Sequence, residues 1–548
     1  MLSATKQNKR RGRRREILEK RYLNPGKGIN VYVSEQYIDD KEGSGSMNST
    51  IVESGGITKR FGWERVGLGL TNAPRGLASY YPTGAAPLMV TVDGDTLKYL
   101  NTSVWTALPA ITFSTAPTRI GFVQAQGRLF IWNGVDAGSQ LSGTTLTRPT
   151  TTIKGGYGIY YADKQIVSGV PEHPNRLYIS SPVDVADFTN TNPTGVGEYS
   201  VYNASTHPAA TTFAGSDANY LDVARDDGDR ITGLAKYTDK LIIFKERAIY
   251  SLQFDTNGLP IVSLVTSAIG CVSHWSIDQV DNDLLFLSRN GYYVFGTQPQ
   301  YFDQLRTNEL SIRVRPFIKA IKSDNLNRAA AIWYDNTYYC SAPVGNSNTN
   351  NRVFTYHRQY TAWLQSNAIA ANAFTTFIDS GNNEGLYYAD DTQAQVWKQT
   401  SGYTDDGEGI DMFWESKAYD LGKFDEVKRF IDFTLLFRQL RGSVKVTITI
   451  DGNRITKNYT IPGTSFSGGM GRGRLGRTLL GGKSERAKSA SNVVTSNIPI
   501  RLNVGENGRT IKVRVQNSTA GESFVLLGYN IGYRPYGRNN FPAELRVY

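Results

Sequence analysis

Short runs of alternating apolar and polar residues, separated by polar turns, fill the middle of the chain. Residues 231–252 read ITGLAKYTDKLIIFKERAIYSL, which is three short strands with two turns, and residues 277–296 repeat that layout. Residues 119–134 and 327–340 give shorter versions. Alternation interrupted by Asn-Gly or Asp-containing turns is typical of β-hairpins. The pattern therefore predicts a succession of antiparallel strands.

The hairpin units recur at a nearly regular spacing. One apolar residue from the middle strand of each unit serves as an anchor, and the anchors lie 41, 48, 64, 43, 54 and 48 residues apart: Leu88, Leu129, Leu177, Leu241, Leu284, Tyr338 and Leu386. Four-stranded propeller blades recur every ~40–50 residues. The spacing predicts a β-propeller of six to eight blades over residues 71–409, with an inserted loop at 189–220. An ordinary set of hairpins forming one or two sandwiches is the alternative.

Longer strands follow residue 409. They are expected at 426–437, 443–450, 498–504, 509–516 and 523–534. Thr447, Thr449, Lys512 and Arg514 alternate with apolar neighbours, so one face is buried and the other solvated. A C-terminal β-sandwich over residues 410–548 follows, with a Gly/Arg-rich loop at 463–488. At the other end we expect a basic arm, residues 1–25, and a segment, residues 26–70, that joins the propeller.

Composition supports this all-β fold class. The chain of 548 residues contains 54 Gly, 32 Tyr and 23 Phe, and aromatic residues suit strands while Gly supplies tight turns. The two cysteines, Cys271 and Cys340, are interpreted as small buried hydrophobic residues, since two cannot form a disulfide framework. No apolar run approaches the ~20 residues that span a bilayer, so no membrane insertion is expected.

Two short segments account for the whole positive charge. Residues 6–21 carry a net charge of +7 and residues 472–488 carry +5, whereas the chain as a whole is +11. The remaining residues therefore sum to −1. In the arm the basic residues are Lys9, Arg10, Arg11, Arg13, Arg14 and Arg15; in the loop they are Arg472, Arg474, Arg477, Lys483, Arg486 and Lys488.

These basic segments allow several interpretations. Most charge runs are solvated tails or exposed loops. Uniform sign and interspersed glycine also suit contact with a polyanion, and six neutralised phosphates imply a slope of about −5 in log K against log salt. We interpret the arm as docking on an acidic partner or on DNA, and the loop as contacting DNA or a protein neighbour; the sequence does not choose between DNA and acidic protein for either segment.

Catalytic and metal-binding patterns are scarce. Residues 471–476 form a literal G-x-G-x-x-G, but the strand, helix and acidic residue of a dinucleotide site are missing around it. The four histidines show no metal-ligand spacing. Residues 226–229 (DDGD) and 405–408 (DDGE) lack the pattern of an EF-hand loop and are interpreted as turns. We expect no catalytic residues, no metal and no cofactor.

One motif near the N-terminus is recognisable. Residues 24–30 (NPGKGIN) and 55–63 (GGITKRFGW) resemble the opening of phage tail proteins: the tail nozzle (tail tubular protein B) of short-tailed phages and the related packaged-DNA stabilisation and tail hub proteins. The matching positions are Gly28, Gly56, Lys59, Arg60 and Gly62. The chain departs from the pattern at Phe61, where the family has proline, and it is compact for a nozzle.

The resemblance implies a structural virion protein, present in the tail and assembled in the host cytoplasm. It implies a homo-oligomeric ring, usually six-fold, that meets the portal, the adaptor and other tail proteins. Double-stranded DNA would be retained and then ejected through the ring without sequence-specific contact, and no covalent chemistry is implied. Nozzle, hub and plug positions stay open.

Two other classes compete with this hypothesis. A propeller can recognise receptors or degrade polysaccharide, in which case convergent carboxylates and sugar-stacking aromatic residues are needed. A cellular DNA- or RNA-binding protein would use the two basic segments for tight, salt-sensitive binding as a monomer.

Overall fold

The chain forms two compact β units. The computed structural model describes residues 17–149, 151–188, 220–255, 260–298, 301–379, 381–462 and 498–538. One unit comprises Phe61–Gly409 with Ile29–Tyr32, and the other comprises Met1–Gly28, Val33–Arg60 and Ile410–Tyr548. The expectation that residues 26–70 join the propeller is wrong for most of that segment, because Val33–Arg60 belongs to the second unit.

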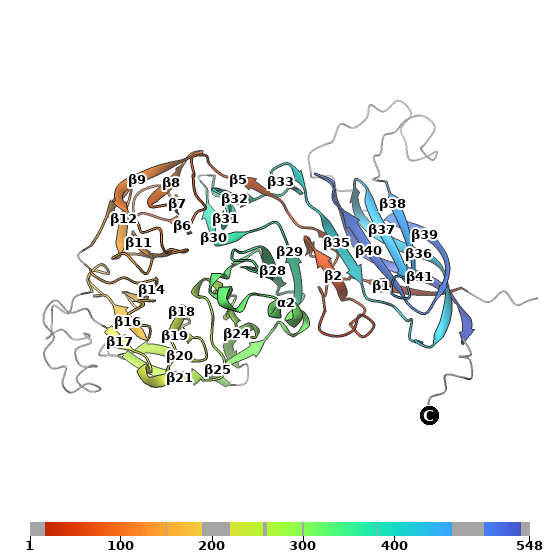
Figure 1. The fold of residues 1–548 in the computed structure, drawn as a ribbon, viewed down its shortest axis with the longest axis horizontal. Coiled ribbons are helices and arrows are strands. Elements are labelled where there is room, and N and C mark those ends of the chain that lie inside the picture. Colours follow the sequence, from red (N-terminus) through yellow and green to blue (C-terminus); the bar gives the residue numbers. More distant parts are fainter. Residues whose placement is uncertain are drawn as a thin grey trace, which may run out of the picture. The chain divides into compact units, whose positions relative to one another are not determined.

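The first unit is a propeller of seven blades, each an antiparallel sheet of four strands (Figure 1). The predicted propeller is confirmed. The first four blades are β6 (Leu77–Tyr80), β7 (Leu88–Asp93), β8 (Thr96–Asn101) and β9 (Val104–Thr112); β10 (Gly121–Ala125), β11 (Arg128–Trp132), β12 (Ser139–Ser142) and β13 (Thr145–Thr147); β14 (Tyr157–Tyr161), β15 (Lys164–Ser168), β16 (Arg176–Ile179) and β17 (Tyr220–Asp222); and β18 (Ile231–Tyr237), β19 (Lys240–Lys245), β20 (Ile249–Phe254) and β21 (Pro260–Thr266).

The remaining three blades complete the ring. They are β22 (Asp278–Val280), β23 (Asp283–Ser288), β24 (Gly291–Gln298) and β25 (Tyr301–Glu309); β26 (Ala330–Tyr334), β27 (Thr337–Ala342), β28 (Arg352–His357) and β29 (Ala362–Ser366); and β30 (Ala371–Ile378), β31 (Glu384–Asp390) and β32 (Val396–Gln399) with β5 (Trp63–Arg65). Between and beside them lie η1 (Arg225–Asp227), η2 (His274–Ser276), η3 (Ile312–Val314), α2 (Arg315–Lys319), η4 (Ser323–Arg328), β33 (Thr404–Asp405) and β34 (Glu408–Gly409).

The seven sequence anchors fall one to a blade. Six lie in the second strand of their blade, and Leu177 lies in the third strand, β16. All except Leu88 are buried. The longest spacing falls in blade three, where β17 follows β16 across the expected insertion. Residues 189–219 of that insertion lie outside the described residues.

Apolar clusters between neighbouring blades form the core of the propeller. One cluster, which includes Leu177 and Leu241, joins blades three and four, and another, which includes Phe244 and Phe286, joins blades four and five. Blades seven and one meet through a cluster that contains Trp105. Cys271 and Cys340 are buried as predicted. The ring is thus stabilised interface by interface, since each blade buries both of its faces.

A strand from the N-terminal side of the propeller closes the ring. β5 pairs antiparallel with β32 as the outermost strand of blade seven. Just before it, the amide of Gly62 donates to the carbonyl of Gly402, and the carbonyl of Gly62 accepts from the amide of Thr400, both at 2.9 Å. A Cβ on Gly62 would lie 1.8 Å from the carbonyl oxygen of Thr404. Only glycine allows the two segments to approach this closely.

The second unit is a β-sandwich of two antiparallel sheets. One sheet has the order β3-β4-β41-β36-β39 with β1 also paired to β41, and the other has the order β2-β35-β40-β37-β38. Their strands are β1 (Leu18–Leu23), β2 (Gly43–Met47), β3 (Ser49–Ile51), β4 (Ile57–Lys59), β35 (Met412–Ser416), β36 (Glu426–Arg441), β37 (Val444–Ile450), β38 (Ile455–Ile461), β39 (Ile498–Gly508), β40 (Ile511–Asn517) and β41 (Ser523–Arg538). The predicted C-terminal sandwich is confirmed, with four N-terminal strands added to it. The expected basic arm is accordingly shorter than residues 1–25, because β1 forms part of a sheet.

We expect Gly62→Ala to disrupt the closure of the propeller. The new Cβ meets a backbone carbonyl, which no rotamer change can move, so the free energy of unfolding should fall by at least about 2 kcal/mol. Gly402→Ala is the matched control, since its Cβ would meet only the Thr400 hydroxyl at 3.5 Å. Denaturant unfolding of both variants measures the difference. Equal stability of the two variants would contradict the close approach.

Candidate functional site: the axial cavity of the propeller

A cavity lies among the inner strands of the propeller. Its volume is about 570 Å³. The inner strands of six blades supply its walls, namely β6, β10, β14, β22, β26 and β30, together with the residues just before several of them. Since the innermost strand of each blade begins near the axis, side chains that precede these strands converge there.

Arg119 spans the cavity at one end. It lies two residues before β10, and 7% of it is exposed. Its guanidinium donates to the carbonyl of Ala329 at 2.9 Å, to the carbonyl of Arg328, and to Oδ1 of Asn372 at 2.8 Å. It also lies 5.0 Å from the ring centroid of Trp275. These partners belong to blades five, six and seven or to their leading segments, so Arg119 links blade two to the opposite side of the ring.

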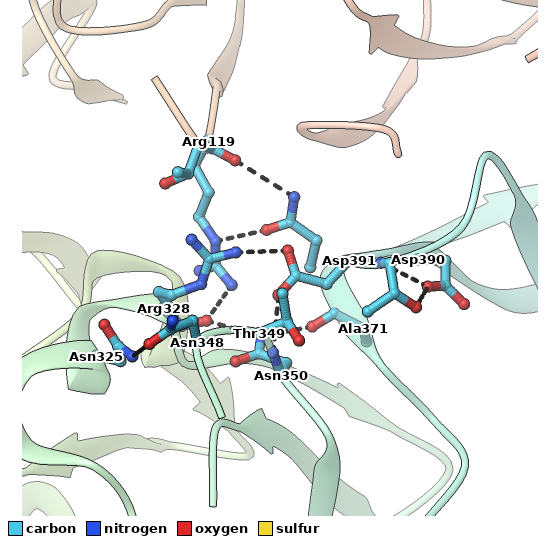
Figure 2. A network of polar contacts seen from close by, with 12 residues as sticks. Arg119, Asn325, Arg328, Asn348, Thr349, Asn350, Ala371, Asp390 and Asp391 are labelled. Carbon is cyan, nitrogen blue, oxygen red and sulfur yellow. Dashed lines mark hydrogen bonds and ion pairs between the residues drawn. The ribbon is translucent and has the colours of Figure 1, made fainter. Parts of the chain in front are cut away.

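A polar network extends from Arg119 into blades six and seven (Figure 2). Arg328 forms an ion pair with Asp391 at 2.7 Å, and the other carboxylate oxygen of Asp391 accepts from the amide of Asn350 at 2.8 Å. The side-chain amide of Asn350 donates to the carbonyls of Arg328 and Ala371. Asp391 therefore neutralises Arg328, while the carbonyls that Arg119 contacts are held in place.

Three further ionisable side chains line the cavity. Arg75 donates to the carbonyls of Ser114 at 2.7 Å, Pro117 at 3.0 Å and Gly94. Asp278 accepts from the amides of Trp333 and Gln279, and burial raises its pKa to about 6. His274 stacks on Tyr157 with 4.5 Å between ring centroids, and burial lowers its pKa to about 4. Burial also lowers the pKa of Arg119 to about 9, so at neutral pH both arginines stay charged and His274 is neutral.

Asp278 is the one carboxylate among the residues that line the cavity. Hydrolysis of glycosidic bonds ordinarily requires two carboxyl groups about 5–10 Å apart. Within the described ranges no group of three or more His, Cys, Asp or Glu side chains is placed to hold a metal ion. The cavity is therefore suited to binding through guanidinium and aromatic groups rather than to acid–base catalysis by paired carboxylates.

None of the helices in the described part of the chain is long and apolar enough to span a bilayer.

All twelve predicted contact residues of the arm and the loop lie outside the described ranges. This holds for the arm residues Lys9, Arg10, Arg11, Arg13, Arg14 and Arg15, and for the loop residues Arg472, Arg474, Arg477, Lys483, Arg486 and Lys488. From the first basic segment only residues 17–21 are described. Lys20, in β1, lies 5.5 Å from the ring centroid of Tyr22. The roles proposed for arm and loop stay predictions.

The motif residues occupy buried backbone-supporting positions. Lys59 is fully buried and donates to the carbonyl of Thr519 at 3.0 Å, and Arg60 donates to Oδ1 of Asn48 at 3.2 Å. A Cβ on Gly56 would lie 3.0 Å from the carbonyl oxygen of Leu526. Gly28 has a φ of +75° and Gly62 closes the propeller. The motif thus crosses the boundary between the two units: its residues up to Arg60 belong to the sandwich unit, and those from Phe61 onward belong to the propeller.

The acidic turns have structural partners. Asp227 accepts from the fully buried ammonium of Lys245 at 2.7 Å. Residues 405–408 form the two-residue hairpin between β33 and β34, and Asp406 pairs with Arg65 of the closing strand at 2.8 Å. Residues 226–229 include the end of the single-turn 3-10 helix η1 and residues 405–408 lie in a tight hairpin, so both segments reverse the chain as the sequence predicts.

The sequence interpretation missed Arg75, Arg119, His274 and Asp278. A signal for the arginines was present, because an arginine stands one or two residues before the inner strand of four blades: Arg75, Arg119, Arg230 and Arg328. Arg230 pairs instead with Glu246 at 2.8 Å. The repeat alone does not indicate which of the four faces the axis.

No protein-family model matches the chain, and no curated protein matches it. Several solved structures resemble it weakly. BamB from Moraxella catarrhalis is 13% identical with a TM-score of 0.33, covering 64% of this chain and 96% of its own. YCF48 bound to a D1 peptide is 8% identical with a TM-score of 0.36, covering 62% and 97%. The exo-β-1,3-galactanase of Phanerochaete chrysosporium is 9% identical with a TM-score of 0.23, covering 86% and 100%. Similarity this low carries no argument about function.

Replacement of Asp278 by Asn should flatten the pH dependence of stability. The pKa of Asp278 is raised from 3.8 to about 6 in the folded protein, so the folded state binds this proton more tightly and the wild type loses stability as pH rises from about 4 to 6. A shift of about two units corresponds to roughly 3 kcal/mol. Relative to the wild type, Asp278→Asn should gain about that much between pH 4 and pH 7.5 in urea unfolding. An unchanged difference would show that the carboxylate is not destabilised by burial.

Proposed function

We propose that this chain is a structural protein of a phage tail that assembles into a ring. The ring retains packaged DNA and forms part of the channel for its ejection. It has no covalent step of its own, it meets the portal, the adaptor and other tail proteins, and it resides in the virion after assembly in the host cytoplasm. The propeller of seven blades and the adjoining sandwich are the scaffold for these contacts.

The motif at residues 55–63 carries this proposal. Its Lys59, Arg60 and Gly62 resemble the family pattern, and each supports the fold. Lys59 donates to the backbone carbonyl of Thr519, Arg60 donates to the side-chain Oδ1 of Asn48, and Gly62 closes the ring of blades. A motif with these positions specifies an architecture rather than a reaction. A resemblance carried by such residues accordingly favours a shared structural role.

The division of charge between the units supports a role beside DNA. Residues 61–409 contain 25 Lys and Arg against 31 Asp and Glu, a net charge of −6, whereas the rest of the chain carries +17. Contact with phosphate would therefore come from the sandwich unit and the two basic segments. An acidic propeller repels DNA, and Arg119 crosses the axis of its cavity. The channel is accordingly proposed to lie between copies in the ring and not through a propeller.

A polysaccharide-degrading function receives less support. The axial cavity presents one lining carboxylate, Asp278, rather than a pair. An isolated monomer that binds nucleic acid tightly would also leave the propeller without a role. Both alternatives predict a discrete monomer, in contrast to a ring.

Imaging of the purified full-length chain by negative-stain electron microscopy tests the proposal. We expect closed rings with a central channel, since the family forms rings below the portal. The sample should also show no hydrolysis of surface polysaccharide. Discrete monomers at all concentrations, or measurable hydrolysis, would overturn the ring proposal.

Neutralising the Gly/Arg-rich loop should weaken DNA binding by the ring. The variant replaces Arg472, Arg474, Arg477, Lys483, Arg486 and Lys488 by Gln, which keeps the loop length. We expect the slope of log K against log salt to become shallower by up to about 5, because six phosphate contacts are lost. The control changes six exposed Lys and Arg of the acidic propeller to Gln, at Arg148, Lys154, Arg225, Lys236, Arg247 and Lys319. If the loop variant keeps the wild-type slope, the loop does not contact DNA.

A further inference from the structure

The axial cavity holds more positive than negative charge. Arg75 and Arg119 line it together with one carboxylate, Asp278, and neutral His274. Arg328, just outside, is neutralised by Asp391. No carboxylate of the described residues forms an ion pair with Arg119, which donates hydrogen bonds to carbonyl and amide oxygens and lies over the ring of Trp275. Among the lining residues two guanidinium groups thus stand against one carboxylate, while Asp95 and Asp136 act on Arg75, and Asp391 on Arg119, from behind the wall.

Carbonyl dipoles only partly offset a buried charge. A guanidinium removed from water needs an anion or several well-placed acceptors to offset its desolvation. The pKa of Arg119 is lowered by burial, which agrees with incomplete compensation. An uncharged side chain could form hydrogen bonds between blades without this desolvation cost. Linking the blades therefore does not by itself explain why Arg119 carries a charge.

Both guanidinium groups keep donors that the protein does not use. A guanidinium has five N–H donors. Arg119 makes three hydrogen bonds within the described part of the chain, which leaves two N–H groups. The terminal nitrogens of Arg75 make three hydrogen bonds, which leaves one terminal N–H group; its Nε is buried and does not reach the cavity. Unused N–H groups on planar guanidinium side chains suit a carboxylate, which accepts through two oxygens.

Aromatic side chains form much of the remaining wall. Phe122 in β10, Trp275 in η2, Trp333 in β26 and Phe374 in β30 all line the cavity and are half-buried, so each keeps exposed surface there. Ser79 and Thr375 add hydroxyl groups. Ligand sites typically measure 300–1,000 Å³ and combine such walls with a few polar groups. The volume of about 570 Å³ falls within this range.

We propose that the axial cavity binds a small acidic sugar, a uronic acid, through its carboxylate. The carboxylate accepts from Arg119 and Arg75, the sugar ring lies against the aromatic wall, and its hydroxyl groups meet Ser79, Thr375 and Asp278. A ring with both polar edges and apolar faces matches this mixture of hydroxyl and aromatic groups better than a bare inorganic anion does. The site lies within one propeller, so it does not depend on the tail function.

Isothermal titration of the full-length protein with sodium glucuronate tests the site. We expect saturable binding of glucuronate and at least tenfold weaker binding of glucose, which has the same ring without the carboxylate. Inorganic phosphate should also bind at least tenfold more weakly than glucuronate. Phosphate binding equal to that of glucuronate would overturn the sugar part of the proposal, and the absence of glucuronate binding would overturn all of it.

Two variants assign the binding to the cavity. Arg75→Met should lower the affinity for glucuronate at least tenfold, because a charge-assisted hydrogen bond is lost. Ala331→Phe places a large side chain on the cavity wall and should block binding while both arginines are retained. Arg128→Met, in the same blade as Arg119 but outside the cavity, is the control and should bind as the wild type does. Thermal unfolding of each variant confirms that it is folded; wild-type affinity in folded Ala331→Phe would place binding elsewhere.

Discussion

The closure of the propeller depends on the approach of two strands from distant parts of the chain. Blade seven has three strands of its own, and β5 supplies the fourth. This pairing fixes the beginning of the propeller against its end, because Gly62 exchanges backbone hydrogen bonds with residues 400 and 402. Without it, the cluster around Trp105 that joins blades seven and one would lose its support.

The axis of the propeller uses a different kind of interaction from its blades. Between blades the contacts are apolar and numerous, whereas at the axis a few charged side chains bond backbone carbonyls across the ring. Arg119 reaches Ala329 and Asn372, far from it in the sequence. Such long-range bonds limit how the blades move relative to one another. They also leave positive charge inside the molecule, which gives the cavity its binding character.

The short segment from Lys59 to Gly62 supports both units of the chain. Its lysine and arginine look in the sequence like surface charges available for a partner, yet both are buried and bonded to the sandwich. Its last glycine belongs to the propeller closure. The resemblance to phage tail proteins therefore rests on residues that support the backbone where the chain passes from one unit to the other. The net positive charge lies elsewhere in the sequence, in residues 6–21 and 472–488.

The sequence by itself determined the all-β class, the blades and the later sandwich. These features depend on local alternation of apolar and polar residues and on turn residues. Because most blades are built from strands that are consecutive in the sequence, evenly spaced apolar residues such as Leu241 and Leu386 were enough to locate them. The sequence also located the net charge, because that requires only a count of the charged residues in each segment. Tertiary structure alone decided that β1–β4 complete the sandwich, that β5 closes the propeller, and that Arg119 faces the axis while Arg230 does not. These three features depend on contacts between residues far apart in the chain. Several strands have a similar pattern of apolar and polar residues, so the pattern alone does not show which of them pairs with a given strand.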